Sequence, residues 1–160
     1  MSEALQPLLD DLANRFGEAI KSKIVDRKIV KIEVGREKLK EVARYLREKQ
    51  GWDHVKAVTG VDLSRTSKKE KMVEIIYHLG TYANEALWNA DLAISYKLDA
   101  ASPVTESLTS IWPSCEYHER EVFEMFGVRF EGHPNLSKLL LPEYWSDIPP
   151  LLKEYEPAGR

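Results

Sequence analysis

Residues 72–99 read MVEIIYHLGTYANEALWNADLAISYKLD, and this stretch contains the two clearest strand patterns of the chain. In each pattern, apolar side chains occupy every second position: Val73, Ile75 and Tyr77 in the first, Leu92, Ile94, Tyr96 and Leu98 in the second. Successive side chains of a strand point to opposite faces. Each pattern therefore predicts a strand with one dry and one wetter face, which is typical of antiparallel sheets.

The segments before this stretch predict two helices and two further strands. Residues 3–21 and 39–46 have leucine, isoleucine, valine, phenylalanine and alanine at helical spacing, whereas residues 30–34 alternate and residues 54–62 resemble a strand. The polar loop 64–70 is expected to join two strands as a long hairpin.

Two shorter helices are expected after residues 72–99. Ser102-Pro103 predicts a helix start, with the helix running through Trp112 until Pro113 stops it. Ser114 is expected to cap a further helix that ends at Gly127.

This order of elements predicts one α+β fold. We expect a mostly antiparallel sheet of about four strands with helices packed on one face, built from residues 1–130. Residues 131–160 contain five of the eight prolines and are expected to form an extended tail that binds a partner. The length of 160 residues suits a single core.

Composition excludes several classes of protein. A lone cysteine, Cys115, excludes an internal disulfide and a cluster held by four cysteines of this chain. The sequence contains no run of about 18 apolar residues, so no membrane-spanning helix is expected. The start of the sequence does not resemble a signal peptide. These features favour a cytoplasmic location.

Charge is unevenly distributed along the chain. The net charge is −3, yet residues 101–160 hold 5 basic and 10 acidic side chains. This acidic part is either a face for a basic partner or an ordinary solvated surface. Nucleic acid is not the expected partner because basic and acidic residues are interleaved and the pI is about 5.9.

Residues 119–136, EREVFEMFGVRFEGHPNL, concentrate charge on an otherwise apolar helix. Arg120 has Glu116 four positions before it and Glu124 four positions after it, so both carboxylates are expected to reach its guanidinium. Such charges need nearly complete pairing if they are buried. The network then serves either to hold the helix on its own sheet or to form an interface.

Other chemistry in this region is weakly supported. His133 lies in the turn Gly132-His133-Pro134-Asn135 and is expected to fix that turn through backbone hydrogen bonds rather than to bind a metal or move a proton. The acidic residues near Cys115 are expected to raise the pKa of its thiol. A free-standing hydrolase that uses paired carboxylates such as Glu121 and Glu124 is the alternative from a different class.

The same region resembles the signature of the C-subunit family of proton-pumping NADH:quinone oxidoreductase, complex I. The matching residues are Glu119, Arg120, Glu121, Gly127, Val128, Phe130, Gly132, His133, Pro134, Asn135, Leu136, Lys138, Leu139 and Leu140. Glu124 stands where that signature has aspartate, and Ser137 replaces its first basic residue. Residues 140–145, LLPEYW, look more like the branch of membrane-bound nickel–iron hydrogenase and sulfane reductase, with NADH- or F420-linked complexes as the alternative.

The resemblance implies a subunit of the peripheral arm that has no active site, cofactor or metal of its own. Its partners would be a hydrogenase-like large subunit, a small iron–sulfur subunit and the membrane arm, with the iron–sulfur clusters and a nickel–iron centre in those partners. It would lie on the cytoplasmic side of the membrane, in an ion-translocating complex. The implied interface or structural residues are Glu116, Glu119, Arg120, Glu121, Glu124, Gly127, Phe130, Gly132, His133, Pro134, Asn135, Leu136, Lys138, Trp145, Leu151, Lys153 and Tyr155.

Overall fold

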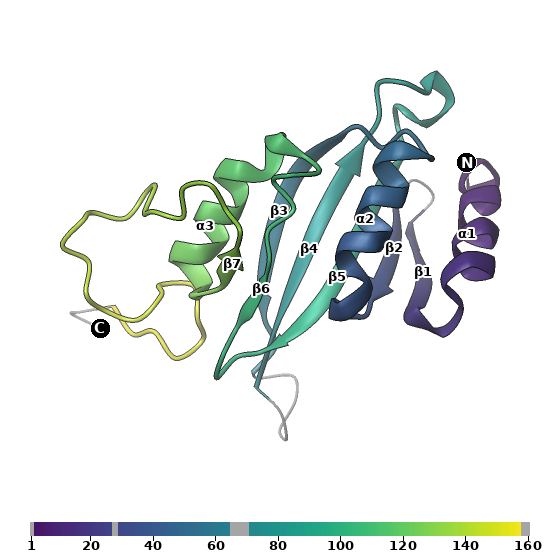
Figure 1. Ribbon diagram of the computed structural model, residues 1–160. Coiled ribbons are helices and arrows are strands. Elements are labelled where there is room, and N and C mark those ends of the chain that lie inside the picture. Colours follow the sequence, from purple (N-terminus) through teal and green to yellow (C-terminus); the bar gives the residue numbers. More distant parts are fainter. Residues whose placement is uncertain (1, 27–28, 65–70, 158–160) are drawn as a thin grey trace.

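The computed structural model describes residues 2–26, 29–64 and 71–157 (Figure 1). Its helices are α1 Ser2–Phe16, α2 Leu39–Glu48 and α3 Glu116–Phe126. Its strands are β1 Ile20–Asp26, β2 Ile29–Val34, β3 His54–Asp62, β4 Met72–Gly80, β5 Asp91–Asp99, β6 Val104–Glu106 and β7 Arg129–Glu131. Short 3₁₀ turns lie at Gly17–Ala19, Arg36–Lys38, Glu85–Leu87 and Pro113–Cys115.

The large sheet has five strands in the order β1-β2-β5-β4-β3. All neighbouring pairs are antiparallel except β2 and β5, which are parallel. The α+β prediction with a mostly antiparallel sheet is therefore confirmed. The predicted hairpin pairs β3 with β4, whereas residues 65–70 of its loop lie outside the described residues.

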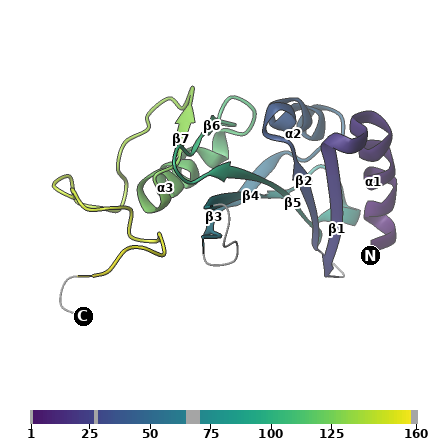
Figure 2. The ribbon, with the colours of Figure 1, turned by 90° about the horizontal axis from the view of Figure 1, so that it is seen from below.

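The core lies between the sheet and the helices. Figure 2 shows α2, α3 and the small sheet β6–β7 on the same side of the large sheet, with α1 beyond α2 near β1. The apolar side chains of the alternating patterns in β4 and β5 are all buried in this core. The opposite face of the sheet carries ion pairs such as Lys31–Glu74 and Glu33–Lys97.

One predicted helix boundary is wrong at the N-terminal end of the fold. The helix predicted over residues 3–21 ends at Phe16, and Gly17 follows it with a φ of +54°. Ile20 then begins β1, which pairs with β2. Periodicity missed this edge strand because the strand follows directly on the helical pattern, and only its pairing with β2 distinguishes the two.

The helix predicted from Ser102 to Trp112 is also wrong. Val104–Glu106 forms β6, which pairs in parallel with β7, so that Thr105 lies opposite Phe130. Beyond β6 the N–H groups of Ile111 and Trp112 donate to the carbonyl of Leu108, which closes only a turn. A pairing partner more than twenty residues away decided this segment, and local proline signals do not report it.

Beyond β7, residues 132–157 contain no helix or strand. This segment, called the tail below, leaves the domain and folds back toward it (Figure 1). None of the helices found among the described residues has the length and apolar character needed to cross a membrane.

Candidate functional site

Helix α3 carries the charged motif and lies against the edge strand β3. The helix ends at Gly127, whose φ of +74° lies in the left-handed region and whose N–H donates to Phe123 O at 2.9 Å. The helix-ending glycine is therefore confirmed. The expected cap by Ser114 is wrong, because the Ser114 hydroxyl instead accepts the N–H of Val55 at 3.0 Å.

Glu119 is completely buried beneath α3. Its carboxylate accepts four hydrogen bonds, from the Tyr77 hydroxyl at 2.8 Å, the Ser107 hydroxyl at 2.6 Å, the Leu108 N–H at 2.9 Å and the Cys115 thiol at 3.3 Å. Within residues 2–26, 29–64 and 71–157, no basic side chain forms an ion pair with it. Glu119 therefore joins α3, β4 and the segment after β6 by hydrogen bonds alone.

The surroundings keep the donors of this network protonated. Burial, reinforced by Tyr96 and Glu119, raises the pKa of Tyr77 well above its ordinary value. Burial and the Glu119 carboxylate likewise raise the pKa of the Cys115 thiol, the direction expected from the sequence. Both groups consequently donate to Glu119 at neutral pH, and Cys115 is not a thiolate nucleophile.

Arg120 and Glu124 hold the tail and not each other. The expected pairing of Arg120 with Glu116 and Glu124 is wrong: its guanidinium donates to Ser137 O and Oγ, each at 3.0 Å, and to Lys138 O at 2.9 Å. The reason is that the tail offers the guanidinium three hydrogen-bond acceptors. An exposed ion pair along the helix would contribute only a few tenths of a kcal/mol.

The buried Glu124 carboxylate holds the next three residues of the tail. It accepts the N–H groups of Leu139 at 2.9 Å, Leu140 at 2.8 Å and Leu141 at 3.0 Å. A carboxylate that accepts several backbone N–H groups satisfies donors that no helix or strand pairs. The motif on α3 thus determines the path of residues 137–141.

His133 fixes the start of the tail through backbone hydrogen bonds. Its Nδ1 accepts the N–H of Asn135 at 3.0 Å, so Nε2 carries the proton and donates to Glu116 O at 3.0 Å. These are the contacts expected of a histidine that fixes a turn. Gly132, with a φ of +80°, makes this turn possible.

One further contact lies within the tail, and another returns the tail to the domain. The Lys138 ammonium donates to Glu143 O at 3.2 Å and Trp145 O at 2.6 Å, which closes a loop within the tail. Farther on, the Lys153 N–H donates to the Asp62 carboxylate at the end of β3 at 2.8 Å. Burial opposes ionisation of Asp62, but hydrogen bonds from Lys153 and Ser64 lower its pKa below the ordinary value.

The tail presents apolar side chains to solvent while its backbone is held. Tyr144 is 85% exposed and Leu140 is 62% exposed. The other large apolar side chains exposed on the tail are Leu139, Ile148 and Leu151. A run of exposed apolar side chains on an ordered backbone is typical of a surface that binds another protein.

The structure brings most of the predicted residues together around α3. The hydrogen bonds above involve Glu116, Glu119, Arg120, Glu124, His133, Asn135 and Lys138. In addition, Leu151 donates its N–H to Met125 O at the end of α3. Phe130 is buried in β7, Leu136 packs on the core, and Trp145 contacts Tyr155 with their rings 5.8 Å apart. Pro134 is exposed.

Glu121 stands apart from this network. It is exposed on α3, whereas both oxygens of Glu124 are occupied by the tail. The two carboxylates proposed as a catalytic pair therefore face different surroundings. Ser107, Ser137 and Asp62 also form contacts of this network but were not predicted from the sequence. Of the three, only Ser137 was marked in the sequence, because a serine stands there in place of a basic residue.

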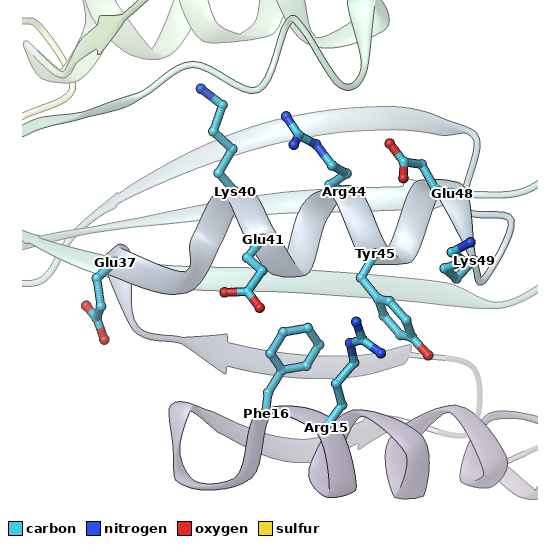
Figure 3. Close-up of a pocket in the computed structure, with 9 residues that line it drawn as sticks. All are labelled: Arg15, Phe16, Glu37, Lys40, Glu41, Arg44, Tyr45, Glu48 and Lys49. Atoms are coloured by element: carbon cyan, nitrogen blue, oxygen red, sulfur yellow. The ribbon is translucent and has the colours of Figure 1, made fainter.

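A separate hollow lies between α1 and α2, with a volume of about 440 Å³. Figure 3 shows Arg15 and Phe16 pointing from α1 toward Tyr45 of α2, and the Arg15 guanidinium lies 4.5 Å from the Tyr45 ring centre. Its charged lining alternates in sign along α2 and the residues on either side of it: Glu37, Lys40, Glu41, Arg44, Glu48 and Lys49. This mixture favours neither an anionic nor a cationic ligand.

Comparison with known proteins shows which family this chain belongs to. The model of the respiratory-chain NADH dehydrogenase 30 Kd subunit family matches residues 32–160. The chain belongs to this family. The resemblance to the C-subunit of complex I is thus confirmed, and the chain is a subunit of the complex-I-like type.

Two relatives have similar sequences along most of the chain. The chain is 31% identical over 150 residues to the C-subunit of the F(420)H(2) dehydrogenase of Methanosarcina mazei, covering 93% of this chain and 90% of that protein. It is 32% identical over 154 residues to the C-subunit of the NADH-quinone oxidoreductase of a Roseiflexus species, covering 95% and 83%.

A solved structure has the same fold as this chain. It is a chain in the membrane-bound sulfane sulfur reductase, an archaeal respiratory membrane complex, with a TM-score of 0.72 at 20% identity. The match covers 94% of this chain and 85% of the other. At this identity the match establishes the fold alone.

Proposed function

We propose that this chain is a non-catalytic subunit of the peripheral arm of a complex-I-like membrane redox complex, where it docks and stabilises the large subunit and the small iron–sulfur subunit. The observation that carries the proposal is the use of the family motif: Arg120 and Glu124 hold the backbone of the tail and so present Leu140 and Tyr144 outward. Arg120 and Glu124 used in this way position a binding surface, and their charged groups are occupied by the tail.

The branch we propose is the membrane-bound hydrogenase or sulfane reductase type. The LLPEYW segment at residues 140–145 supports it. The second candidate is the C-subunit of an F420- or NADH-linked oxidoreductase, which the sequence identities of 31% and 32% favour. In either case the iron–sulfur clusters, and in a hydrogenase the nickel–iron centre, belong to the partners.

In the proposed arrangement the chain lies on the cytoplasmic side of the membrane and is held there by its partners. The ion pumping of such a complex takes place in the membrane arm. This chain holds the electron-transferring subunits in fixed positions relative to each other. The tail is the expected contact because its ordered backbone costs little additional conformational entropy on binding.

A tagged purification from native membranes in mild detergent tests the proposal. We expect recovery of a hydrogenase-like large subunit, an iron–sulfur subunit and membrane subunits, all identified by mass spectrometry. Subunits that bind NADH or F420 would select the second candidate. A lone monomer that carries hydrolase activity would overturn the proposal in favour of the carboxylate enzyme.

Limited trypsin digestion gives an independent test on the tail. Cleavage after Lys138 and Lys153 is expected in the isolated chain and is expected to be suppressed in the purified complex. Equal cleavage rates in both states would contradict docking through the tail, whatever subunits are recovered with it.

A further inference from the structure

The edge strand β3 has an unpaired stretch of backbone beside α3. β3 is the last strand of the sheet and pairs only with β4 among the described residues. The Leu63 N–H donates to Met72 O at 2.9 Å, and hydrogen-bonded pairs alternate along an antiparallel ladder. Thr59 therefore faces β4, whereas the N–H and C=O groups of Val58 and Gly60 point away from the sheet.

Other parts of the chain contact this edge at both ends. At one end the Ser114 hydroxyl accepts the Val55 N–H, next to the bulge between Val55 and Ala57. At the other end the Asp62 carboxylate accepts the Lys153 N–H of the tail. The open stretch between them offers the donors and acceptors of Val58 and Gly60, enough for about four hydrogen bonds.

A groove of about 350 Å³ runs along this open stretch. Val122, Met125 and Phe126 of α3 form one wall, and Leu151 of the tail contributes to the rim. Gly60 permits the close approach of this wall, because a Cβ there would lie 2.5 Å from the Phe126 ring. These side chains offer an apolar wall to the side chains of an added strand, and His118 and Glu121 of α3 supply the polar part of the lining.

One charge at the groove has no partner in the described part of the chain. Glu121 is exposed, lines the groove, and forms neither a hydrogen bond nor an ion pair with a residue that the structure describes. A basic side chain on the occupant would complement it. The 10 acidic and 5 basic side chains of residues 101–160 reinforce this preference.

We propose that an extended segment of a partner subunit adds to β3 at Val58 and Gly60, with apolar side chains against Met125 and Phe126 and a lysine or arginine against Glu121. Strand addition of this kind takes affinity from backbone hydrogen bonds and specificity from the side-chain pockets. It also covers an edge that would otherwise favour aggregation. The inference rests on the proposed function, since the segment belongs to a subunit of the same complex, and it names a second interface beside the tail.

Hydrogen exchange on the purified complex and on the isolated chain tests strand addition. We expect the amides of Val58 and Gly60 to exchange slowly in the complex and rapidly in the isolated chain, while the amide of Thr59 is slow in both. Rapid exchange at Val58 and Gly60 in a complex whose tail is protected would overturn strand addition and leave the proposed function standing. An unprotected tail and no recovered partners would instead contradict the proposed function.

Photo-crosslinking identifies the occupant. A photoreactive phenylalanine analogue at position 125 is expected to crosslink, within the purified complex, to a partner segment that contains a lysine or arginine and alternating apolar residues. A crosslink to a second copy of this chain would overturn the proposal in favour of edge-to-edge dimers.

A charge variant completes the test. Glu121→Arg is expected to weaken retention of the crosslinked partner at least tenfold, because like charges then meet in the groove. The matched control is Glu18→Arg, a glutamate that is also exposed but lies in the turn after α1, outside both the groove and the tail. Equal effects of both variants would count against a role of the groove, and circular dichroism of each isolated variant excludes misfolding as the cause.

Discussion

At the scale of single residues, Glu119 is the position on which the fold around α3 depends most directly. Its four donors come from β4, from residues 107–108 and from the turn before α3. Within the described residues no cation offsets its charge, so these donors alone replace the water that it loses. Glu119 therefore has a structural role that its place in a charged motif does not reveal.

Replacing Glu119 by alanine leaves four buried donors without an acceptor. We expect Glu119→Ala to lower the free energy of unfolding by about 3–5 kcal/mol, the range for broken buried polar networks. Glu121→Ala, an exposed change on the same helix, is expected to alter it by less than about 0.5 kcal/mol. Urea denaturation of both isolated variants measures the difference, and a similar loss in both would refute the buried role.

Cys115 provides a second test at this scale. Because burial and Glu119 raise the pKa of its thiol, native protein at pH 8 is expected to react with a thiol reagent only through unfolding. The rate should therefore rise with urea concentration along the unfolding curve. Rapid labelling without denaturant would show that the thiol is accessible and ionised.

At the scale of elements, α3 and the tail act as one unit. α3 supplies the carboxylate and the guanidinium, and the tail supplies backbone N–H and C=O groups that no strand pairs. The predicted helix was correct in its end at Gly127, but the predicted partners of Arg120 were wrong. Helical spacing identifies neighbours on one helix and carries no information about a segment that folds back beside it.

Removing the carboxylate of Glu124 should release this segment. Glu124→Ala leaves the N–H groups of Leu139, Leu140 and Leu141 unpaired, so the cleavage rate of the isolated chain after Lys138 is expected to rise about tenfold. Trypsin digestion followed by mass spectrometry measures the rate. Glu121→Ala is the control and should leave it unchanged.

The contact between Asp62 and Lys153 makes the tail sensitive to acid. The pKa of Asp62 is lowered from 3.8 in the folded chain, so its stabilising effect is present above pH 3.8 and is lost as the pH falls through the folded value. The urea midpoints of wild type and Asp62→Asn are therefore expected to converge as the pH is lowered below 3.8. Midpoints that stay equally far apart at all pH values would exclude this contact as the cause.

At the scale of the whole molecule, the buried core and the binding surfaces are separate. The core lies between the sheet and the helices, whereas the exposed apolar side chains of the tail lie beyond β7. A chain that ends after Leu136 should therefore still unfold cooperatively, with Tm lowered by less than about 10 °C. The same truncation is expected to abolish recovery of partner subunits from membranes, and full recovery would argue against docking through the tail.

The sequence alone determined the α+β class, the boundaries of β3 and the C-terminal end of α3, because alternation, helical periodicity and a left-handed glycine are local properties of the chain. It also determined the family, since the motif around Glu119 and His133 is long and specific. Only the tertiary structure decided that β1 and β6 are strands, that Glu119 lies inside the domain, and that Arg120 and Glu124 hold the tail. These contacts join residues far apart in sequence, and local patterns do not specify which distant donor or acceptor will be nearest once the chain has folded.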